Sequence, residues 1–150
     1  MQPTLEYTTN PELFSAVALA FFADNDLTAY TDPSEALQFI LAVDEIVELY
    51  TARLAADEMA LPEELVVQLG SALGEAFIVV FGGVWEYVES IGRWQVGLVL
   101  PSNDSISINV FHKLEKRFEN GDDDSISYLF EMIRKVYLEE MDLFPEEPAQ

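Results

Sequence analysis

The sequence predicts an α+β fold made of three N-terminal helices, a three-stranded antiparallel meander at about residues 84–109, and two C-terminal helices. Two changes of pattern indicate this order. Apolar residues recur at helical spacing near both ends of the chain, whereas the segment between them alternates with a period of two and is broken by turn residues. A length of 150 residues, without a repeat or a linker, predicts a single domain over residues 1–150.

The first two helices begin with the same signal, a capping residue followed by proline at the first helical position. The pair Asn10-Pro11 precedes an apolar run at 13–22, which predicts a well-buried helix. The pair Asp32-Pro33 opens an amphipathic helix that we expect over about residues 33–57.

A third helix begins at Pro62 and is expected to stop at Gly82-Gly83. Gly70 and Gly74 lie four residues apart, so they share one helix face and allow a neighbouring element to come close. Close packing against the sheet explains this pattern. The alternative is that these glycines form the floor of a pocket between the sheet and this helix, with Glu75 pointing into it.

Short runs at 84–88, 94–100 and 106–108 predict the three strands, because turn residues separate them. Asn109 is placed to cap a helix over 110–119, where its side chain would accept from an unpaired backbone N–H.

The helix after Asn109 is expected to stop at Asn120-Gly121. A last helix follows the acidic run Asp122–Ser125, with Asp124 as its cap, and its apolar positions extend to Tyr137. Residues 145–150 form an acidic, proline-containing tail that we expect to be frayed.

Charge limits the partners that this chain can meet. It carries 28 acidic and 7 basic residues, a formal net charge of −21. Residues 1–92 contribute −15 and contain one cation, Arg53, whereas residues 93–150 contribute −6. A strongly anionic surface repels nucleic acid and anionic membranes and attracts basic proteins. Half of the residues are hydrophobic, which excludes intrinsic disorder and predicts an ordinary core beneath the charge.

Several site classes are excluded by composition. The chain has no cysteine, which removes thiolate nucleophiles and Cys-ligated metals, and it has one histidine, His112. It contains no phosphate-binding glycine loop and no nucleophile elbow. We therefore assign no catalytic residue, metal or cofactor, and the sequence leans against an enzyme. No secretory signal or apolar run of membrane-spanning length is visible, which predicts a cytoplasmic protein.

Two carboxylates on the second helix form an acidic pair. Asp44 and Glu48 lie four residues apart on one face, where like charges repel, so a selected use such as binding a hard cation is conceivable. The run Asp122–Asp124 lacks the alternation of a calcium loop and is interpreted as a solvated acidic loop.

A small basic island stands out in this anionic chain. Lys113, Lys116 and Arg117 fall on one face of the helix after Asn109. They are placed either to hold a buried carboxylate, for which Glu75 is a candidate, or to receive an anionic ligand. The simpler interpretation is that they neutralise nearby acids and favour the C-terminal end of the helix dipole.

Aromatic residues gather around the predicted sheet, and we interpret them as core. A nucleic-acid stacking platform would need interleaved cations, and residues 84–100 contain one, Arg93. The aromatic residues concerned are Trp85, Tyr87, Trp94, Phe111 and Phe118.

One block of residues carries a resemblance to known families. It comprises Leu69-Gly70-x-x-Leu73-Gly74-Glu75, then Gly82-Gly83-x-Trp85, then Ile108-Asn109-x-Phe111-x-Lys113-x-x-Lys116-Arg117-x-Glu119-Asn120-Gly121-x-x-Asp124-Ser125. Over about residues 65–137 it resembles small bacterial families described only as domains of unknown function, some of which are similar to immunity proteins of toxin systems. The resemblance implies no catalytic residue. It draws attention to the recurrent polar and aromatic positions Glu75, Trp85, Asn109, Lys113, Lys116 and Arg117.

These observations leave three functions open. The first is a protein-binding module, similar to an immunity protein, whose anionic face docks a basic protein partner. The second is a small-ligand or enzymatic domain with a pocket between the sheet and the Gly74 helix, in which Glu75 is the acid and the basic island contacts an anion. The third is a DNA mimic. The first is the function that we predict, and the charge also has a simpler use in solubility.

Overall fold

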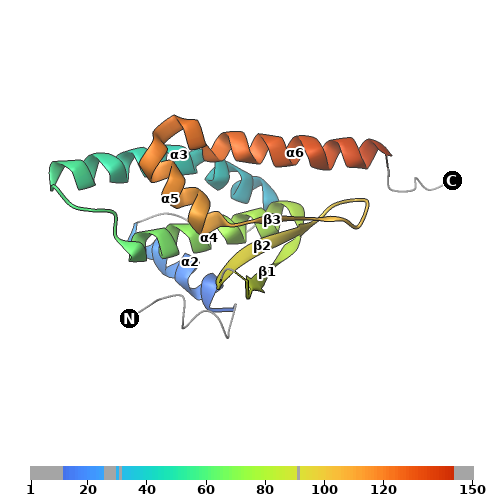
Figure 1. The fold of residues 1–150 in the computed structure, drawn as a ribbon, viewed down its shortest axis with the longest axis horizontal. Helices are drawn as coiled ribbons and strands as arrows, with labels where there is room; N and C mark the ends of the chain where they lie inside the picture. The colour runs from blue at the N-terminus through green and yellow to red at the C-terminus, as the bar shows by residue number, and fades with distance from the viewer. Residues whose placement is uncertain (1–11, 26–29, 31, 91, 144–150) are drawn as a thin grey trace.

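The computed structural model describes residues 12–25, 30, 32–90 and 92–143 and confirms the α+β class (Figure 1). The expected cap at Asn10-Pro11 and the tail at 145–150 lie outside these residues. The elements are α2 (Glu12–Asp24), α3 (Pro33–Ala56), α4 (Glu63–Phe81), β1 (Gly83–Val88), β2 (Arg93–Val99), β3 (Ser105–Ile108), α5 (Val110–Asn120), a 3₁₀ turn η1 (Gly121–Asp124) and α6 (Ile126–Leu143).

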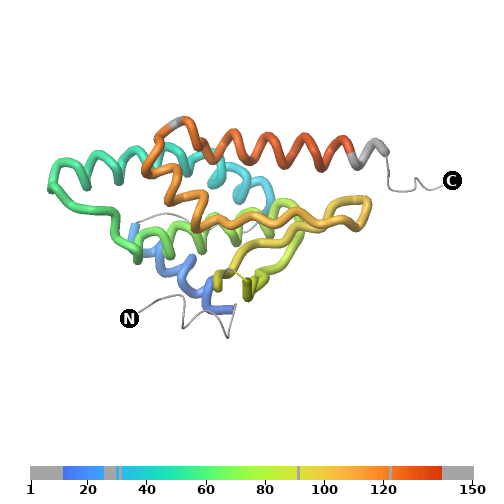
Figure 2. The backbone as a smooth tube through the Cα atoms, in the orientation of Figure 1, coloured from blue at the N-terminus to red at the C-terminus, as the bar shows by residue number. Residues whose placement is uncertain are grey.

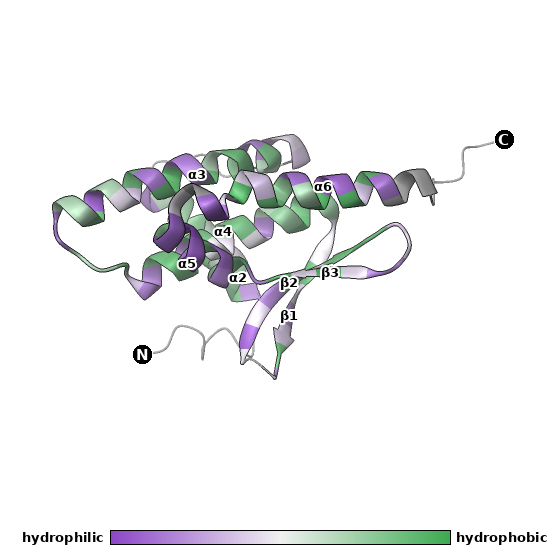
Figure 3. Ribbon diagram, turned by 45° about the horizontal axis from the view of Figure 1, so that its top comes forward, coloured by the Kyte–Doolittle hydropathy of each residue, from purple (hydrophilic) through white to green (hydrophobic). Residues whose placement is uncertain are grey.

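Helix α4 is the centre of the molecule. It packs against α2, α3, α5 and the strands β1 and β2, and 11 of its 19 residues are buried. Among the described helices it alone is long and apolar enough to cross a membrane by length and composition, yet 61% of its most apolar window is buried inside the fold. Burial of this kind is typical of a core helix, and Figure 3 shows its apolar colouring beneath the outer helices.

The remaining helices surround α4. Helices α3 and α6 pack against each other and run antiparallel along one side of the molecule, while α2 lies on another side of α4 (Figures 1 and 2). Phe77 and Phe81 of α4 contact the Phe130 ring of α6, with ring centroids 6.3 and 5.6 Å apart. Aromatic contacts therefore join α6 to the central helix α4, in addition to its packing against α3.

The sheet is an antiparallel meander in the order β1-β2-β3. Its register places Trp85 beside Val96 and Val96 beside Ile108, so these three side chains share one face. That face is covered by helices, since Val96 and Ile108 are buried. The opposite face is open: Val84 is 61% exposed and Val99 is 55% exposed.

Local signals explain most of the element ends. Asp32 caps α3 by accepting a hydrogen bond from the backbone N–H of Glu35 at 2.9 Å. Gly82 ends α4 with φ of 78°, a conformation that favours glycine. Asn109 caps α5 and accepts from the His112 N–H at 3.1 Å, as predicted.

Two expectations about the helices are wrong. Helix α2 buries one face rather than its whole circumference, because Leu19 is 60% exposed and small alanines flank it. The run Asp122–Asp124 does not start α6. It lies in η1, and Ser125 makes the capping bond to the Tyr128 N–H at 3.2 Å in place of Asp124.

The glycine pattern of α4 has a steric cause. A Cβ atom at Gly74 would collide with the indole ring of Trp85, and it would lie 3.1 Å from Val96 Cγ2. A Cβ at Gly70 would likewise collide with the Phe111 ring. These glycines therefore let the sheet and α5 approach the helix backbone closely.

We predict that Gly74→Ala destabilises the fold by about 1–3 kcal/mol, because the Trp85 ring must move. Glycine-to-alanine changes at open helix positions stabilise by about 0.5–1 kcal/mol, so the sign of the change is diagnostic. Urea unfolding measures it. Ala52→Gly on the exposed side of α3 calibrates the propensity effect alone, and a stabilised Gly74→Ala protein would contradict this account of the contact.

Candidate functional site

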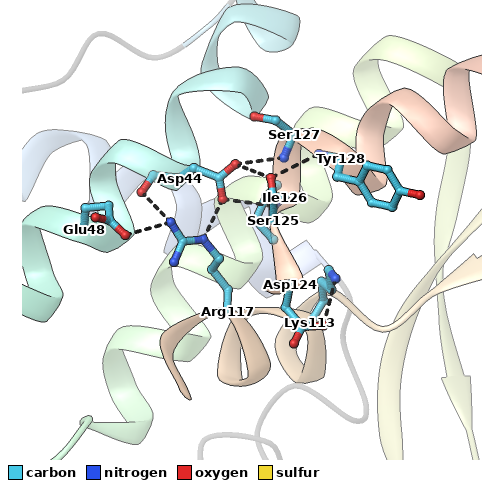
Figure 4. A network of polar contacts seen from close by, with 9 residues as sticks. All are labelled: Asp44, Glu48, Lys113, Arg117, Asp124, Ser125, Ile126, Ser127 and Tyr128. Atoms are coloured by element: carbon cyan, nitrogen blue, oxygen red, sulfur yellow. Dashed lines mark hydrogen bonds and ion pairs between the residues drawn. The ribbon is translucent and has the colours of Figure 1, made fainter. Parts of the chain in front are cut away.

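The most strongly connected polar group in the described structure joins α3, α5 and α6 (Figure 4). Arg117 of α5 is only 2% exposed, and its Nε donates to Asp44 Oδ1 of α3 at 2.7 Å. Its Nη2 donates to Glu48 Oε2 at 3.0 Å and to the Asp44 carbonyl oxygen at 3.3 Å. A buried guanidinium is tolerable only when its charge and donors are matched, and these acceptors supply that match.

Asp44 also satisfies the start of α6. Its carboxylate accepts from the backbone N–H groups of Ile126 at 2.9 Å and Ser127 at 3.0 Å, and from Ser125 Oγ at 2.9 Å. The first N–H groups of a helix lack partners within the helix and carry partial positive charge. One carboxylate thus serves a cation and a helix end at once.

This environment shifts the pKa values of Asp44 and Arg117. Burial alone would raise the pKa of Asp44, but the hydrogen bonds from the backbone of Ile126 and Ser127, followed by those from Arg117 and Ser125, lower it to about 2. Burial would lower the pKa of Arg117, but hydrogen bonds and charge from Asp44 and Glu48 outweigh it and raise that pKa. The pair is therefore fully charged near neutral pH.

The basic island is divided by the structure. Lys113 pairs with Asp124 at 3.3 Å, whereas Lys116 is exposed and Arg117 is buried against α3. The pKa of the Asp124 carboxyl is lowered by its hydrogen bond from Asn120 and by Lys113. Arg117 does hold carboxylates, as one interpretation of the sequence predicted. They belong to Asp44 and Glu48, however, and not to Glu75.

Glu75 belongs to a second, separate group. Its carboxylate accepts from Trp85 Nε1 at 2.8 Å and from Ser15 Oγ at 2.7 Å. The Trp85 ring is stacked on Phe14 with centroids 4.1 Å apart and on Phe111 at 5.8 Å. Glu75 and Trp85 are thus brought together, but as a link between α2, α4 and β1.

The six residues singled out by the sequence therefore do not form one group. Glu75 and Trp85 form one link, and Arg117 belongs to the Asp44 group. Asn109 caps α5, Lys113 pairs with Asp124 of η1, and Lys116 is exposed. These residues do not converge on one ligand. Within residues 12–25, 30, 32–90 and 92–143, no group of three or more His, Asp or Glu side chains is placed to hold a metal ion.

An exposed set of carboxylates lies on α3, the following turn and the first turn of α4. We call it the acidic helical surface. Its members make no ion pair with any cation of the described residues, and all are exposed: Glu45, Asp57, Glu58, Glu63 and Glu64. An open groove of about 420 Å³ runs between the end of α3 and the start of α4, with Tyr50, Asp57 and Glu64 among its walls.

A smaller cavity of about 40 Å³ lies where β2 meets α2, α4 and α5. Phe14, Trp94 and Phe111 form aromatic walls, and Arg93 and Glu115, paired at 3.4 Å, stand beside them. Trp94 is 8% exposed. Its Nε1 is the one buried side-chain polar atom for which the described structure offers no hydrogen-bond partner.

Comparisons with known proteins add no assignment, because no family model, curated protein or solved structure matches the chain.

Sequence reasoning singled out Asp44, Glu48 and Arg117 separately but did not predict that they pair. The sequence signal was a pair of acids four residues apart on one helix face. The arginine that donates hydrogen bonds to both, Arg117, lies 69 residues from Glu48 in the sequence. Ser125 and the unpaired Trp94 donor gave no sequence signal, since serine in a turn and tryptophan in a strand are ordinary occurrences.

We predict that Asp44→Ala destabilises the fold by about 3–5 kcal/mol, because it leaves a buried arginine with too few acceptors and uncaps α6. Glu48→Ala is the matched control. Its side chain is 64% exposed, so we expect a loss of no more than about 1 kcal/mol. Chemical denaturation of both variants tests this, and equal losses would show that Asp44 has no special role.

The lowered pKa of Asp44 predicts an acid-dependent loss of stability. Because the folded-state pKa of about 2 lies below the ordinary value of 3.8, the contribution is complete above pH 3.8 and disappears as the pH falls towards 2. It amounts to at most about 2 kcal/mol. We expect the stability difference between the native protein and Asp44→Asn to shrink over this window, as measured by urea unfolding between about pH 5 and pH 2.5. A constant difference would contradict the assigned pKa.

Proposed function

We propose that the chain is a non-catalytic protein-binding module, similar to an immunity protein, that docks a basic protein partner through its acidic helical surface. The observation that carries this proposal is the unequal distribution of charge pairing. Four of the seven cations are held by carboxylates of the same chain. The acidic helical surface makes no ion pair with a cation of the described residues, and Arg53, which lines the groove between α3 and α4, lies over the Tyr50 ring instead.

Internal pairing makes the exposed charge more one-sided than composition alone requires. Arg117 is taken out of solvent, and Arg93, Lys113 and Arg134 each lie against a carboxylate. The acids left over on α3 and α4 project a negative field that speeds encounter with a basic surface and disfavours acidic partners.

The groove between α3 and α4 gives this surface a shape as well as a charge. It is lined by the apolar residues Leu54 and Leu65 and by the acids Asp57 and Glu64, which outnumber its one lining cation, Arg53. Apolar and acidic lining residues suit the aliphatic stem and charged head of a lysine or arginine side chain. Neutralisation of a basic protein is a use for such a surface, and some of the families that the sequence resembles are similar to immunity proteins.

We predict that binding depends on where the acids lie and not only on how many there are. A surface variant carries Glu45→Gln, Asp57→Asn, Glu58→Gln and Glu64→Gln. A control variant carries Glu89→Gln, Glu119→Gln, Asp123→Asn and Glu139→Gln, which are exposed positions elsewhere. Both variants lose four negative charges. Partners captured from a cell extract at low salt should be lost by the surface variant and kept by the control.

The affinity for a captured partner should fall at least about tenfold between roughly 50 and 500 mM salt, since exposed charge pairs are screened over this range. Titration of the purified pair measures this. If the two variants bind the partner equally, or if the affinity does not change with salt, the acidic helical surface is not the recognition element and its charge serves solubility.

A further inference from the structure

One wall of the small cavity, Trp94, carries a buried hydrogen-bond donor that has no acceptor in the described structure. The indole ring is packed at 5.7 Å from Phe14 and at 5.5 Å from Tyr87, centroid to centroid, so the side chain is fixed in place. Its Nε1–H is buried and has no acceptor in the described structure. A buried donor left without an acceptor is costly, and in native proteins such a group points to a bound water or ligand.

The second indole of the chain shows what a satisfied donor looks like. Trp85 Nε1 donates to Glu75 Oε2 at 2.8 Å. The two tryptophans of the sequence thus form an internal comparison, with one donor paired inside the protein and one facing no protein acceptor.

The walls of the cavity restrict the ligand. Its volume of about 40 Å³ is well below the roughly 150 Å³ that admits benzene, so a ligand of a few heavy atoms fits. The unpaired Nε1–H of Trp94 requires a hydrogen-bond acceptor from the ligand. Glu63 and Glu115 also line the cavity and are acceptors themselves, with Arg93 the one cation between them.

Charge and hydrogen bonding together favour a neutral group that both accepts and donates. A carboxylate would supply an acceptor but would meet a net negative wall, since Arg93 offsets only one of Glu63 and Glu115, and an ammonium ion has no acceptor to offer Trp94. A carboxamide carries no charge, and it has a carbonyl oxygen that accepts and an NH₂ group that donates. We propose that this cavity is a binding site for a small carboxamide group, whose carbonyl oxygen accepts from Trp94 Nε1 and whose NH₂ donates to a carboxylate at the wall. This site shares Glu63 with the acidic helical surface, but it does not rest on the docking proposed for that surface.

Three probes of four heavy atoms test the proposal. Acetamide, acetone and acetate are nearly the same size and differ in charge and donors. Each is titrated into the ¹⁵N-labelled protein while the two indole N–H signals are followed by NMR, and Trp94→Phe identifies which signal belongs to Trp94. Acetamide should shift the Trp94 signal with a saturable, millimolar dissociation constant and leave the Trp85 signal in place.

Acetone, which lacks the donor, should bind about 3- to 10-fold more weakly, and acetate should give no saturable shift. Val67→Ile, which fills the cavity from α4, should abolish the acetamide response while keeping the Trp85 signal as a marker of the native fold. N-acetylasparagine methylamide and N-acetylalanine methylamide distinguish the source of the group, because both carry backbone amides and only the first carries a carboxamide. A response to the first alone indicates an asparagine side chain of a peptide, and a response to neither indicates a free amide.

Two results would overturn the assignment. If no probe shifts the Trp94 signal saturably, the cavity holds only water. If acetate binds as well as acetamide, Arg93 dominates the site and the ligand is an anion. Neither result bears on the salt-dependent docking of a basic protein, which is tested by changing Glu45, Asp57, Glu58 and Glu64, and none of these lines the cavity.

Discussion

Asp44 and Arg117 make the contact on which the arrangement of the outer helices depends. The guanidinium on α5 is buried, the carboxylate comes from α3, and the same carboxylate holds the first N–H groups of α6. Such a pair is no stronger than well-packed apolar residues would be, because burying two charges is costly. Its value is positional. Leaving either Asp44 or Arg117 buried without the other would cost folding free energy. The placement of α5 and α6 against α3 that satisfies all of these donors and acceptors is therefore favoured over others.

The same interaction shapes the electrostatics of the surface. The chain has few cations. One of them, Arg117, is buried inside the fold, and Arg93 and Lys113 are paired with neighbouring acids. The acidic helical surface therefore has no ion-pair partner among the described residues. The ion pair that orders the helices thus also increases the contrast between an acidic helical surface and a mixed-charge region around α5. The internal pairing of cations and the proposed recognition of a basic partner are linked in this way.

The sequence predicted the elements well and the contacts between them poorly. Capping residues such as Asp32 and Asn109, and the stop at Gly82, act within a few residues of their own helix, so local patterns reveal them. The start of α6 was misassigned because its acidic partner is Asp44, which lies on another helix and is distant in sequence. The basic island was recognised, but a helical pattern cannot say which of several acids its arginine will meet. Charge pairing is a tertiary fact, and many acids compete for each cation in this chain.

Hydrogen-bond satisfaction separates structural polar groups from available ones in this molecule. Glu75 was the acid of a ligand pocket in the alternative interpretation of the sequence, yet Ser15 and Trp85 both donate to it, and the Trp85 ring fills the space beside Gly74. Its carboxylate is engaged in holding α2 and β1 to α4, which removes the reason to treat it as an acid that serves a ligand. Trp94 was expected to be core and is buried, yet its donor is unmet beside a small cavity. The residue with the more reactive side chain is therefore committed to structure, and the one that looked purely structural keeps a free donor. For this fold, an unpaired donor is a better guide to a ligand than the chemical reactivity of a side chain.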